Sequence, residues 1–321
     1  MREHGGNLDL AQQRFGGRAE DWIDLSTGIN RRPYPVGEIS AHHWQALPSR
    51  SEIEALHQAA QHAYGTSAPV VAMGGVQAAI QLLPQLAPHG LARILAPTYN
   101  EYAPVLSAAG WQVEQVGKLD ALAGADLAIV VNPNNPDGRR HAPKDLLALS
   151  PRAGRLVIDE SFADAVPELS LASEAGRPGL LILRSFGKFY GLAGLRLGFA
   201  IGHTADIARL AAASGPWPVS GAAIAIGCRA LRDEAWAKAT SARLVRDCAR
   251  LDAMAQAQGW RLVGGASLFR LYETPDALAA QERLARGQIW SRVFAKQPTW
   301  LRLGLPGAEA EWTRLAEMLA R

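Results

Sequence analysis

The sequence predicts an α/β protein in which a large domain, with a mostly parallel sheet flanked by helices, is joined to a smaller α+β domain. Short runs rich in β-branched residues alternate with stretches rich in alanine and leucine, and this order indicates parallel strands joined by crossover helices. After the segment SGPWP at 214–218 the pattern changes to long amphipathic helices and short strand-like pieces. The length of 321 residues exceeds the usual size of one domain, so we expect two unequal parts.

We expect six strands in the larger part, several of them apolar enough to be covered on both faces. Their ranges are 69–73, 92–96, 127–131, 155–158, 180–184 and 196–201. In the smaller part we expect helices over 221–232 and 233–258, and strand-like pieces around 261–263, 268–272 and 300–303. Open sheets of this kind bind ligands at the carboxyl ends of their strands, and the segments at 73–77, 132–138, 159–162 and 185–198 each follow one of these runs.

The composition is that of a globular protein, with 48% apolar and 20% charged residues. No apolar run approaches the roughly 18 residues of a membrane span, and the first residues, MREHGGNLDL, are polar. We therefore expect no membrane partner, no signal peptide and a cytoplasmic protein. Cys228 and Cys248 are too few and too unpatterned for a disulfide scaffold or a zinc site, and we interpret both as packing residues.

Neither nucleic acid nor metal is an expected partner. The net charge is +3, but the arginines are scattered along the chain and not clustered, which is typical of solvated helix faces with a few anion sites. The histidines at positions 42, 43, 57 and 62 lack the spacing and the companion carboxylates of a helical zinc site.

The segment SFGKFYGLAGLRLG at 185–198 contains one lysine, Lys188, among glycines and apolar residues. A desolvated setting disfavours the charged form of an amine, and the neutral amine is the form that attacks a carbonyl to make a Schiff base. Ser185 and Arg196 could meet one phosphate, the first through a hydroxyl donor and the second through a two-pronged guanidinium. A bare S-x-x-K pattern is more often a glycine-rich loop with an ordinary surface lysine, but here the longer pattern favours a site.

This segment resembles the lysine motif of the pyridoxal-5′-phosphate (PLP) enzymes of the aspartate aminotransferase fold, which is the PLP transferase fold of type I. The resemblance covers nearly the whole chain and is closest to the branch that holds histidinol-phosphate aminotransferases and threonine-phosphate decarboxylases. It implies that PLP is the cofactor, that Lys188 bonds to it covalently, and that Ser185 and Arg196 hold its phosphate. It also implies an N-terminal arm with part of the small domain (1–40), a large PLP-binding domain (41–215) and a small C-terminal domain (216–321).

Two further loops carry cofactor contacts by this resemblance. The loop MGGVQ at 73–77 joins an expected strand to an expected helix, where backbone N–H groups can hold an anion; without the resemblance, an ordinary turn is more common. By position, Gly75, Val76 and Gln77 correspond to the family's phosphate contacts, although Val76 and Gln77 replace the more usual small or acidic residues. Tyr99, after the second strand, matches the residue whose ring stacks on the pyridine.

Two polar motifs complete the expected cofactor site. The loop NPNNPDG at 132–138 is rich in turn formers, and Asn135 matches the asparagine that hydrogen-bonds the phenolic oxygen of PLP. The motif DESF at 159–162 places Asp159 at the end of a buried strand, where an N-cap or ion pair is the ordinary role. By the resemblance, Asp159 keeps the pyridine nitrogen protonated, so that the ring can accept electrons. Lys188 and Asp159 are the expected catalytic residues.

Two positions depart from the pattern of the transaminases. Phe162 stands where transaminases of this fold commonly have a tyrosine that donates to the phenolic oxygen, and phenylalanine there resembles the decarboxylase branch. Leu47 stands where relatives usually have a tyrosine that reaches the cofactor phosphate of a partner subunit. The resemblance still implies a homodimer.

Substrate residues are expected in the N-terminal part and the small domain. The segments HGGN at 4–7 and DLSTGIN at 24–30 resemble segments typical of threonine-phosphate decarboxylases; a bare HGGN would more often be a mobile terminus. We expect His4 near the substrate phosphate, Gly5 beside it among the substrate-binding residues, and Gly28, Ile29 and Asn30 lining the pocket. Arg302 matches the arginine that forks onto the substrate α-carboxylate.

The expected activity is therefore PLP-dependent decarboxylation of a small phosphorylated amino acid, L-threonine O-3-phosphate, to (R)-1-amino-2-propanol O-2-phosphate in cobalamin biosynthesis. One alternative is an aminotransferase for histidinol phosphate or a similar phosphorylated amine, against which Phe162 and the HGGN segment weigh. A second alternative is a non-catalytic PLP-binding regulatory domain, which the full set of catalytic residues disfavours.

Overall fold

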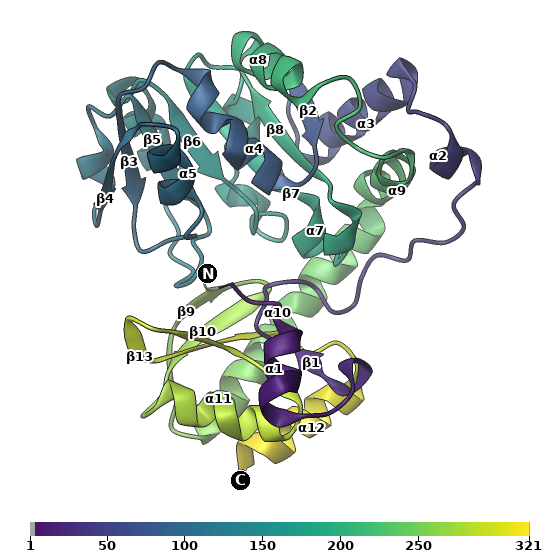
Figure 1. The fold of residues 1–321 in the computed structure, drawn as a ribbon, viewed down its shortest axis with the longest axis vertical. Coiled ribbons are helices and arrows are strands. Elements are labelled where there is room, and N and C mark those ends of the chain that lie inside the picture. Colours follow the sequence, from purple (N-terminus) through teal and green to yellow (C-terminus); the bar gives the residue numbers. More distant parts are fainter. Residues whose placement is uncertain (1–3, 321) are drawn as a thin grey trace.

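The computed structural model describes residues 4–320, so the outermost ends of the expected domain ranges, residues 1–3 and 321, lie outside the described residues. A seven-stranded sheet with helices on both faces forms the upper part of the molecule, and a smaller sheet with its own helices forms the lower part (Figure 1). The expected α/β class and the mostly parallel sheet are confirmed. The boundaries at 40 and 215 stay a prediction.

The large sheet has the strand order β2-β8-β7-β6-β5-β3-β4. Neighbours from β4 to β7 are parallel, whereas β8 runs antiparallel to both β2 and β7. The strands are β2 (Val70–Met73), β3 (Leu91–Leu95), β4 (Gln112–Val116), β5 (Leu127–Val131), β6 (Leu156–Asp159), β7 (Leu180–Ser185) and β8 (Gly198–Gly202).

The inner strands are buried on both faces because their side chains alternate between two hydrophobic clusters. On β6, for example, Leu156 and Ile158 belong to one cluster and Val157 belongs to the other. The covering helices are α3 (Arg50–Ala63), α4 (Val76–Leu82), α5 (Tyr102–Ala108), α6 (Pro143–Leu149), α7 (Phe186–Phe189), α8 (Thr204–Ser214) and α9 (Gly221–Arg232). A short helix, α2 (His42–Gln45), precedes them.

Two differences from the expected strands have physical reasons. The sequence patterns did not predict β4, because QVEQV is a partly exposed edge strand in which polar residues interrupt the apolar run. The last strand was expected from residue 196 but begins at Gly198. Arg196 instead ends a 3-10 turn, and its φ of 55° lies in the left-handed region, which no strand uses.

The small sheet has the antiparallel order β12-β13-β10-β9. Its strands are β9 (Arg261–Ala266), β10 (Phe269–Glu273), β12 (Arg292–Phe294) and β13 (Gln297–Gly304). Helix α10 (Glu234–Ala257) runs from the large part into the small one, where α11 (Ala277–Arg286) and α12 (Glu309–Ala320) complete the layer (Figure 1).

The N-terminal segment packs on the small part. Strand β1 (Ile23–Asp24) pairs in parallel with β11 (Ile289–Trp290), and α1 (Leu8–Phe15) lies beside α11. Trp22 and Trp290 share a small apolar cluster at this junction. This pairing joins the N-terminal segment to residues near position 290 in the small part of the molecule. Among residues 4–320, the helices are all too short or too polar to cross a membrane.

Candidate active site

A cavity of about 200 Å³ opens at the carboxyl ends of β5, β6 and β7. All the residues expected to contact the cofactor line it, although they come from five separate segments of the chain. They are Gly75, Val76, Gln77, Tyr99, Asn135, Asp159, Ser185, Lys188 and Arg196. Phe162, Ser161 and Gly187 also line the cavity. The roles of these residues stay predictions, but the structure brings them together.

Lys188 lies on α7, the single helical turn that follows β7. Burial lowers the pKa of its amine to about 8, and the nearby guanidinium of Arg302 adds to the effect. The Nζ atom lies 5.9 Å from the centre of the Phe162 ring. A cation is disfavoured in such surroundings, so a substantial fraction of Lys188 is a neutral, nucleophilic amine near neutral pH.

The lowered pKa predicts how the cofactor-free protein captures PLP as the pH changes. Only the neutral amine attacks an aldehyde, so the capture rate should rise about tenfold per pH unit below pH 8 and level off above it. An amine with the ordinary pKa of 10.5 would instead keep accelerating to beyond pH 10. Stopped-flow absorbance after mixing with PLP measures this rate, and a bend near pH 10 would contradict the assignment.

The side of the cavity near β8 is suited to an anion. The φ of Gly75 is +82°, and a Cβ added there would fall 2.8 Å from a terminal nitrogen of Arg196. The guanidinium thus lies against a position that only glycine leaves open. Arg196 NH1 donates to the Ala193 carbonyl at 3.0 Å, and Ser185 and the start of α4 face the same cavity. Hydroxyl, guanidinium and backbone N–H groups together match the donors that hold a phosphate.

Asp159, at the end of β6, is buried, and both of its carboxylate oxygens accept hydrogen bonds. Its Oδ2 accepts from the Tyr102 hydroxyl at 2.6 Å, and its Oδ1 accepts from the Ser161 backbone N–H at 2.9 Å and from the Ser161 hydroxyl. The sequence analysis did not identify Tyr102 or Ser161. Ser161 directly follows the DE pair, but Tyr102 stands 57 positions from Asp159, so only the fold reveals the second contact.

Arg302 comes from β13 of the small sheet and is 2% exposed. Its NH1 donates to Asn135 Oδ1 at 2.5 Å and its NH2 to the Ser26 carbonyl at 2.6 Å, while its buried Nε has no hydrogen-bond partner. Burial lowers the pKa of Arg302 to about 9, and the neighbouring Arg292 adds to the effect. A buried guanidinium that donates to neutral oxygens is poorly compensated, and a carboxylate ligand would supply the missing charge.

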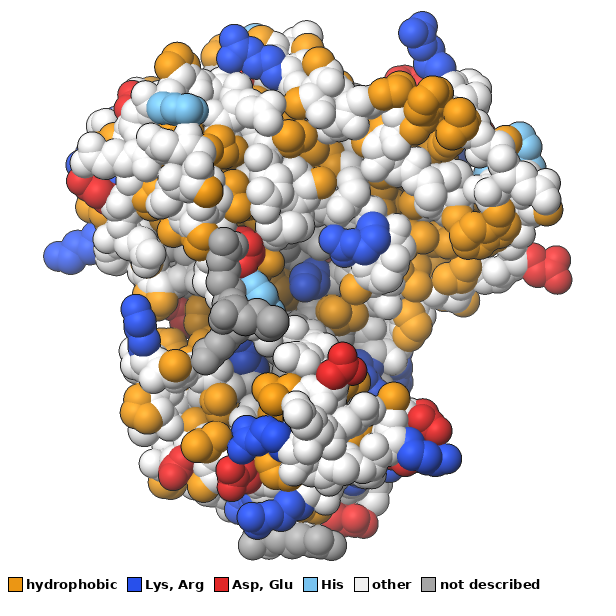
Figure 2. Space-filling view, viewed as in Figure 1, with side chains coloured by type: hydrophobic (Ala, Val, Ile, Leu, Met, Phe, Trp, Pro, Cys, Tyr) orange, Lys and Arg blue, Asp and Glu red, His pale blue; other side chains and the backbone are white. Residues whose placement is uncertain are grey.

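The two expected substrate segments of the N-terminal part meet beside Arg302. Gly6 N donates to Ser26 Oγ at 2.7 Å, and the carbonyl of the same serine is the acceptor of Arg302. A Cβ on Gly5 would fall 2.3 Å from that carbonyl oxygen. His4 Nε2 lies 2.8 Å from Glu101 Oε1, and its ring centre is 6.0 Å from that of Tyr99. Basic side chains lie in the hollow between the upper and lower parts on this face (Figure 2).

The other expected substrate residues lie close by without lining the cavity itself. A Cβ on Gly28 would fall 2.8 Å from Phe162 and 3.0 Å from Phe269, so this glycine lies between two rings that are 5.0 Å apart. Ile29 follows it and is partly buried. Asn30 contacts α7, the helix that contains Lys188. Its backbone N–H donates to the Lys188 carbonyl at 3.0 Å and its Nδ2 to the Phe189 carbonyl at 2.9 Å. These contacts support Lys188, and a substrate contact of Asn30 stays a prediction.

Arg292 on β12 is a third site residue that the sequence patterns did not identify. It lines a neighbouring cavity of about 530 Å³ together with Tyr99, Asn135 and Lys296. Its charge lowers the pKa of both Lys188 and Arg302. The only sequence signal is a basic residue ten positions before Arg302, which by itself indicates nothing about the site.

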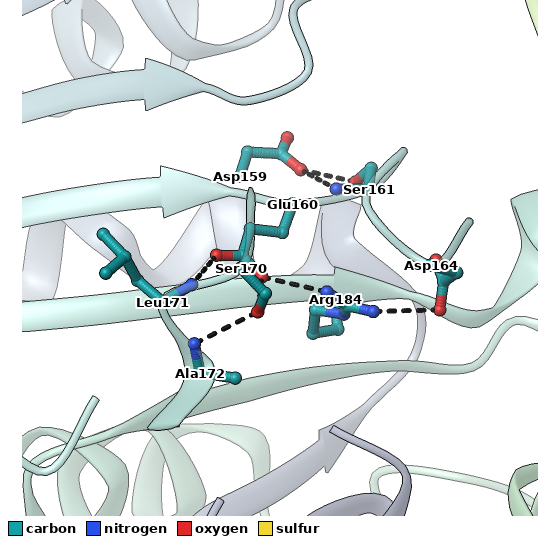
Figure 3. A network of polar contacts seen from close by, with 8 residues as sticks. All are labelled: Asp159, Glu160, Ser161, Asp164, Ser170, Leu171, Ala172 and Arg184. Atoms are coloured by element: carbon teal, nitrogen blue, oxygen red, sulfur yellow. Dashed lines mark hydrogen bonds and ion pairs between the residues drawn. The ribbon is translucent and has the colours of Figure 1, made fainter. Parts of the chain in front are cut away.

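A buried ionic network stands behind Asp159, on the opposite side of the strand end (Figure 3). Arg184 donates to Glu160 Oε2 at 2.9 Å and to Asp164 Oδ1 at 3.1 Å. Glu160 also accepts from the Ser170 hydroxyl at 2.6 Å and the Leu171 N–H at 2.7 Å. Burial raises the pKa of both carboxyls, and Arg184 opposes that shift. The network therefore depends on Arg184, and it ties β6 and β7 together beneath the site.

Arg184→Met should lower the free energy of unfolding by about 3–5 kcal/mol, because it leaves two buried carboxylates without their cation. Urea unfolding at pH 7.5 measures the loss. The matched control is Arg177→Met, which removes an exposed pair with Glu174 at 2.7 Å and should cost less than about 1 kcal/mol. Equal losses in the two variants would contradict the importance of the network.

Comparison with known proteins identifies relatives over nearly the whole chain. The family model described as "Aminotransferase class I and II" matches residues 40–319. A threonine-phosphate decarboxylase from Sinorhizobium sp is 45% identical, with 99% of this chain and 97% of the relative covered. One from Pseudomonas aeruginosa is 42% identical, with 98% and 96% covered. The solved structure of histidinol-phosphate aminotransferase from Sinorhizobium meliloti in complex with pyridoxal-5′-phosphate has a TM-score of 0.82 at 19% identity, covering 97% of this chain and 94% of its own.

Proposed function

Since this chain belongs to the aminotransferase class I and II family, we propose that it is a PLP-dependent enzyme that decarboxylates L-threonine O-3-phosphate to (R)-1-amino-2-propanol O-2-phosphate for cobalamin biosynthesis. The relatives named threonine-phosphate decarboxylase, at 42% and 45% identity over nearly the full length, support this proposal. The structural observation that carries it is a buried arginine, Arg302, which donates to neutral oxygens beside a cavity that holds the reactive Lys188.

The cavity residues fit PLP. Gly75 leaves the space into which Arg196 reaches, and with Ser185 this guanidinium would hold the cofactor phosphate. Asn135 would donate its amide group to the phenolic oxygen, because its Oδ1 is already taken by Arg302. Asp159 would pair with the ring nitrogen. When bound, PLP supplies an aldehyde that condenses with amines and a protonated ring that accepts the electron pair of the bond being broken.

Each remaining task falls to a residue of the chain. Arg302 would bind the α-carboxylate of the substrate through its two-pronged guanidinium and fix the orientation of the amino acid. Phe162, Phe269 and Gly28 form an apolar wall next to Lys188, which keeps water from the reacting centre. Lys188, with a pKa of about 8, is suited to returning a proton to Cα after carbon dioxide leaves.

Purified protein loaded with PLP should release carbon dioxide from threonine phosphate and form no glutamate when 2-oxoglutarate is added. Glutamate formed in step with loss of an amino donor such as histidinol phosphate, without carbon dioxide, would instead identify an aminotransferase. Absence of turnover with every amine tested would point to a binding or regulatory role. Phe162, which has no hydroxyl to donate to the phenolic oxygen, favours the first result.

We propose that the substrate phosphate is bound at the N-terminal segment. The ring centre of His4 lies 6.0 Å from that of Tyr99, which lines the cofactor cavity, and Arg292 of β12 lines the neighbouring cavity together with Tyr99. The phosphate and the α-carboxylate would thus be bound by different parts of the chain, with Arg302 reserved for the carboxylate.

His4→Ala, or deletion of residues 1–7, should weaken binding of threonine phosphate by about 1.5–3 kcal/mol, the range for hydrogen bonds to charged groups. PLP absorbance should not change, since His4 does not line the cofactor cavity. Inhibition constants for phosphorylated and unphosphorylated substrate analogues measure the effect. The control is His62→Ala, which removes a histidine paired with Glu234 at the same 2.8 Å distance on the surface. Unchanged affinity in the His4 variant would refute the assignment.

We also propose a homodimer in the cytoplasm. Trp44, Leu47 and Trp217 are large apolar side chains that are more than half exposed, and apolar side chains gather on this face near α2, α3 and α9 (Figure 2). Exposed apolar patches of this kind often mark interfaces. The two free cysteines, Cys228 and Cys248, are in keeping with a reducing compartment. Sedimentation showing only a 34.4 kDa species with full activity would contradict the dimer.

A further inference from the structure

Tyr102 is fully buried at the first turn of α5, and its hydroxyl donates to Asp159 Oδ2 at 2.6 Å. Burial raises the pKa of Tyr102 well above its usual value, and the adjacent Asp159 adds to the effect, so the hydroxyl stays protonated and acts as a donor. Tyr102 does not line the cofactor cavity. Its ring meets that of Tyr99, a cavity residue, edge to face at 6.3 Å, but its hydroxyl reaches the cavity through Asp159.

The other oxygen of Asp159 has its own donors. Ser161 supplies its backbone N–H at 2.9 Å and its hydroxyl to Oδ1. Each carboxylate oxygen is thus fixed by a donor on the protein side, while the carboxylate remains on the cavity wall. Donors to a carboxylate stabilise its negative charge and reduce its tendency to take up a proton.

We propose that Tyr102 is a positioning residue that keeps the proton shared by Asp159 and the cofactor on the ring nitrogen. In a buried site a carboxylate and a pyridine nitrogen compete closely for one proton, because desolvation disfavours the ion pair relative to the two neutral groups. A hydrogen bond to the charged carboxylate shifts the equilibrium constant for this proton transfer by roughly ten- to a hundredfold. The Tyr102 hydroxyl therefore favours the protonated ring, which is the form that accepts electrons.

This inference rests on the proposed cofactor site and not on the choice of substrate. It predicts that Tyr102→Phe, which removes only the hydroxyl, moves the proton toward Asp159. Loading the protein with PLP labelled with ¹⁵N in its ring and measuring the ring-nitrogen chemical shift without substrate reports the position of the proton directly. The shift should move toward that of unprotonated pyridine, and kcat should fall about tenfold or more with little change in KM.

The chain offers a matched control. The Tyr272 hydroxyl donates to Asp252 Oδ1 at 2.7 Å, and this tyrosine is also buried, on β10 of the small sheet. Tyr272→Phe loses a similar hydrogen bond and should leave the ring-nitrogen shift unchanged. If Tyr102→Phe does not retain the cofactor, Ser161→Ala removes the hydroxyl donor of the other oxygen and should move the shift in the same direction.

The outcomes separate the two proposals. A wild-type protein that gives no signal from bound PLP would contradict the cofactor site itself. A clear wild-type signal that is unchanged in Tyr102→Phe, or changed equally in Tyr272→Phe, would overturn only the role of Tyr102.

Discussion

Lys188→Ala is expected to abolish the visible absorbance of PLP bonded to the protein and to reduce decarboxylation by at least roughly 10²–10⁴-fold, the range for a lost general acid–base group. The substitution removes the amine that bonds to the cofactor and the group that we propose returns a proton to Cα. Absorbance spectra after dialysis against PLP, and single-turnover release of carbon dioxide, measure the two losses separately.

The control for this variant is Lys144→Ala, which removes an exposed lysine on α6 and should change neither quantity. If Lys188→Ala kept near wild-type decarboxylation, Lys188 would not be the reactive amine, whatever its position in the cavity.

Asp159→Asn should retain bound PLP but lower kcat by roughly 10²–10³-fold, a loss typical of removing one electrostatic stabiliser from an active site. A neutral amide cannot hold the ring nitrogen in its protonated form. The amide would also replace one acceptor oxygen with an NH₂ donor, which would then face the hydroxyl donor of Tyr102 or Ser161. Absorbance confirms that cofactor is present, and steady-state kinetics measure the loss.

A matched substitution is Asp252→Asn, at an aspartate that also accepts from a tyrosine hydroxyl but lies in the small part. It should lower stability through its pair with Arg270 and leave kcat per bound cofactor unchanged. Full activity in Asp159→Asn would show that another group keeps the ring nitrogen of PLP protonated.

That the expected cofactor residues meet in one cavity was predictable from sequence, because they lie at or just after the ends of strands, while their roles come from the family resemblance and stay predictions. Asn135, Asp159 and Lys188 come directly after apolar runs that the patterns identify, and the carboxyl ends of parallel strands meet at one edge of a sheet. The opposite direction of β8 cannot be derived from its own residues, because a fully buried strand has the same apolar composition in either direction. The edge strand β4 was not predicted because two of its five side chains are exposed and none is fully buried, so its apolar run is interrupted.

The unpredicted parts of the site depend on contacts between distant segments. Tyr102 reaches Asp159 only because α5 lies over the sheet, and Arg292 comes near Lys188 only because the small part closes against the large one. His4 and Glu101 are likewise 97 positions apart. Neither periodicity nor motif spacing reports such proximity. Asn30 was expected at the substrate, yet its hydrogen bonds to α7 show a structural task that its motif did not indicate.

The proposed reaction breaks the bond from Cα to the carboxylate and leaves the Cα–H bond intact. The most direct measurement is the reaction of threonine phosphate, labelled with ¹³C in its carboxylate, in deuterated water. We expect all of the label in carbon dioxide and an aminopropanol phosphate that keeps its original Cα hydrogen and gains one deuterium at the same carbon. Label retained in a 2-oxo acid, with the original Cα hydrogen lost to solvent, would contradict decarboxylation and identify transamination.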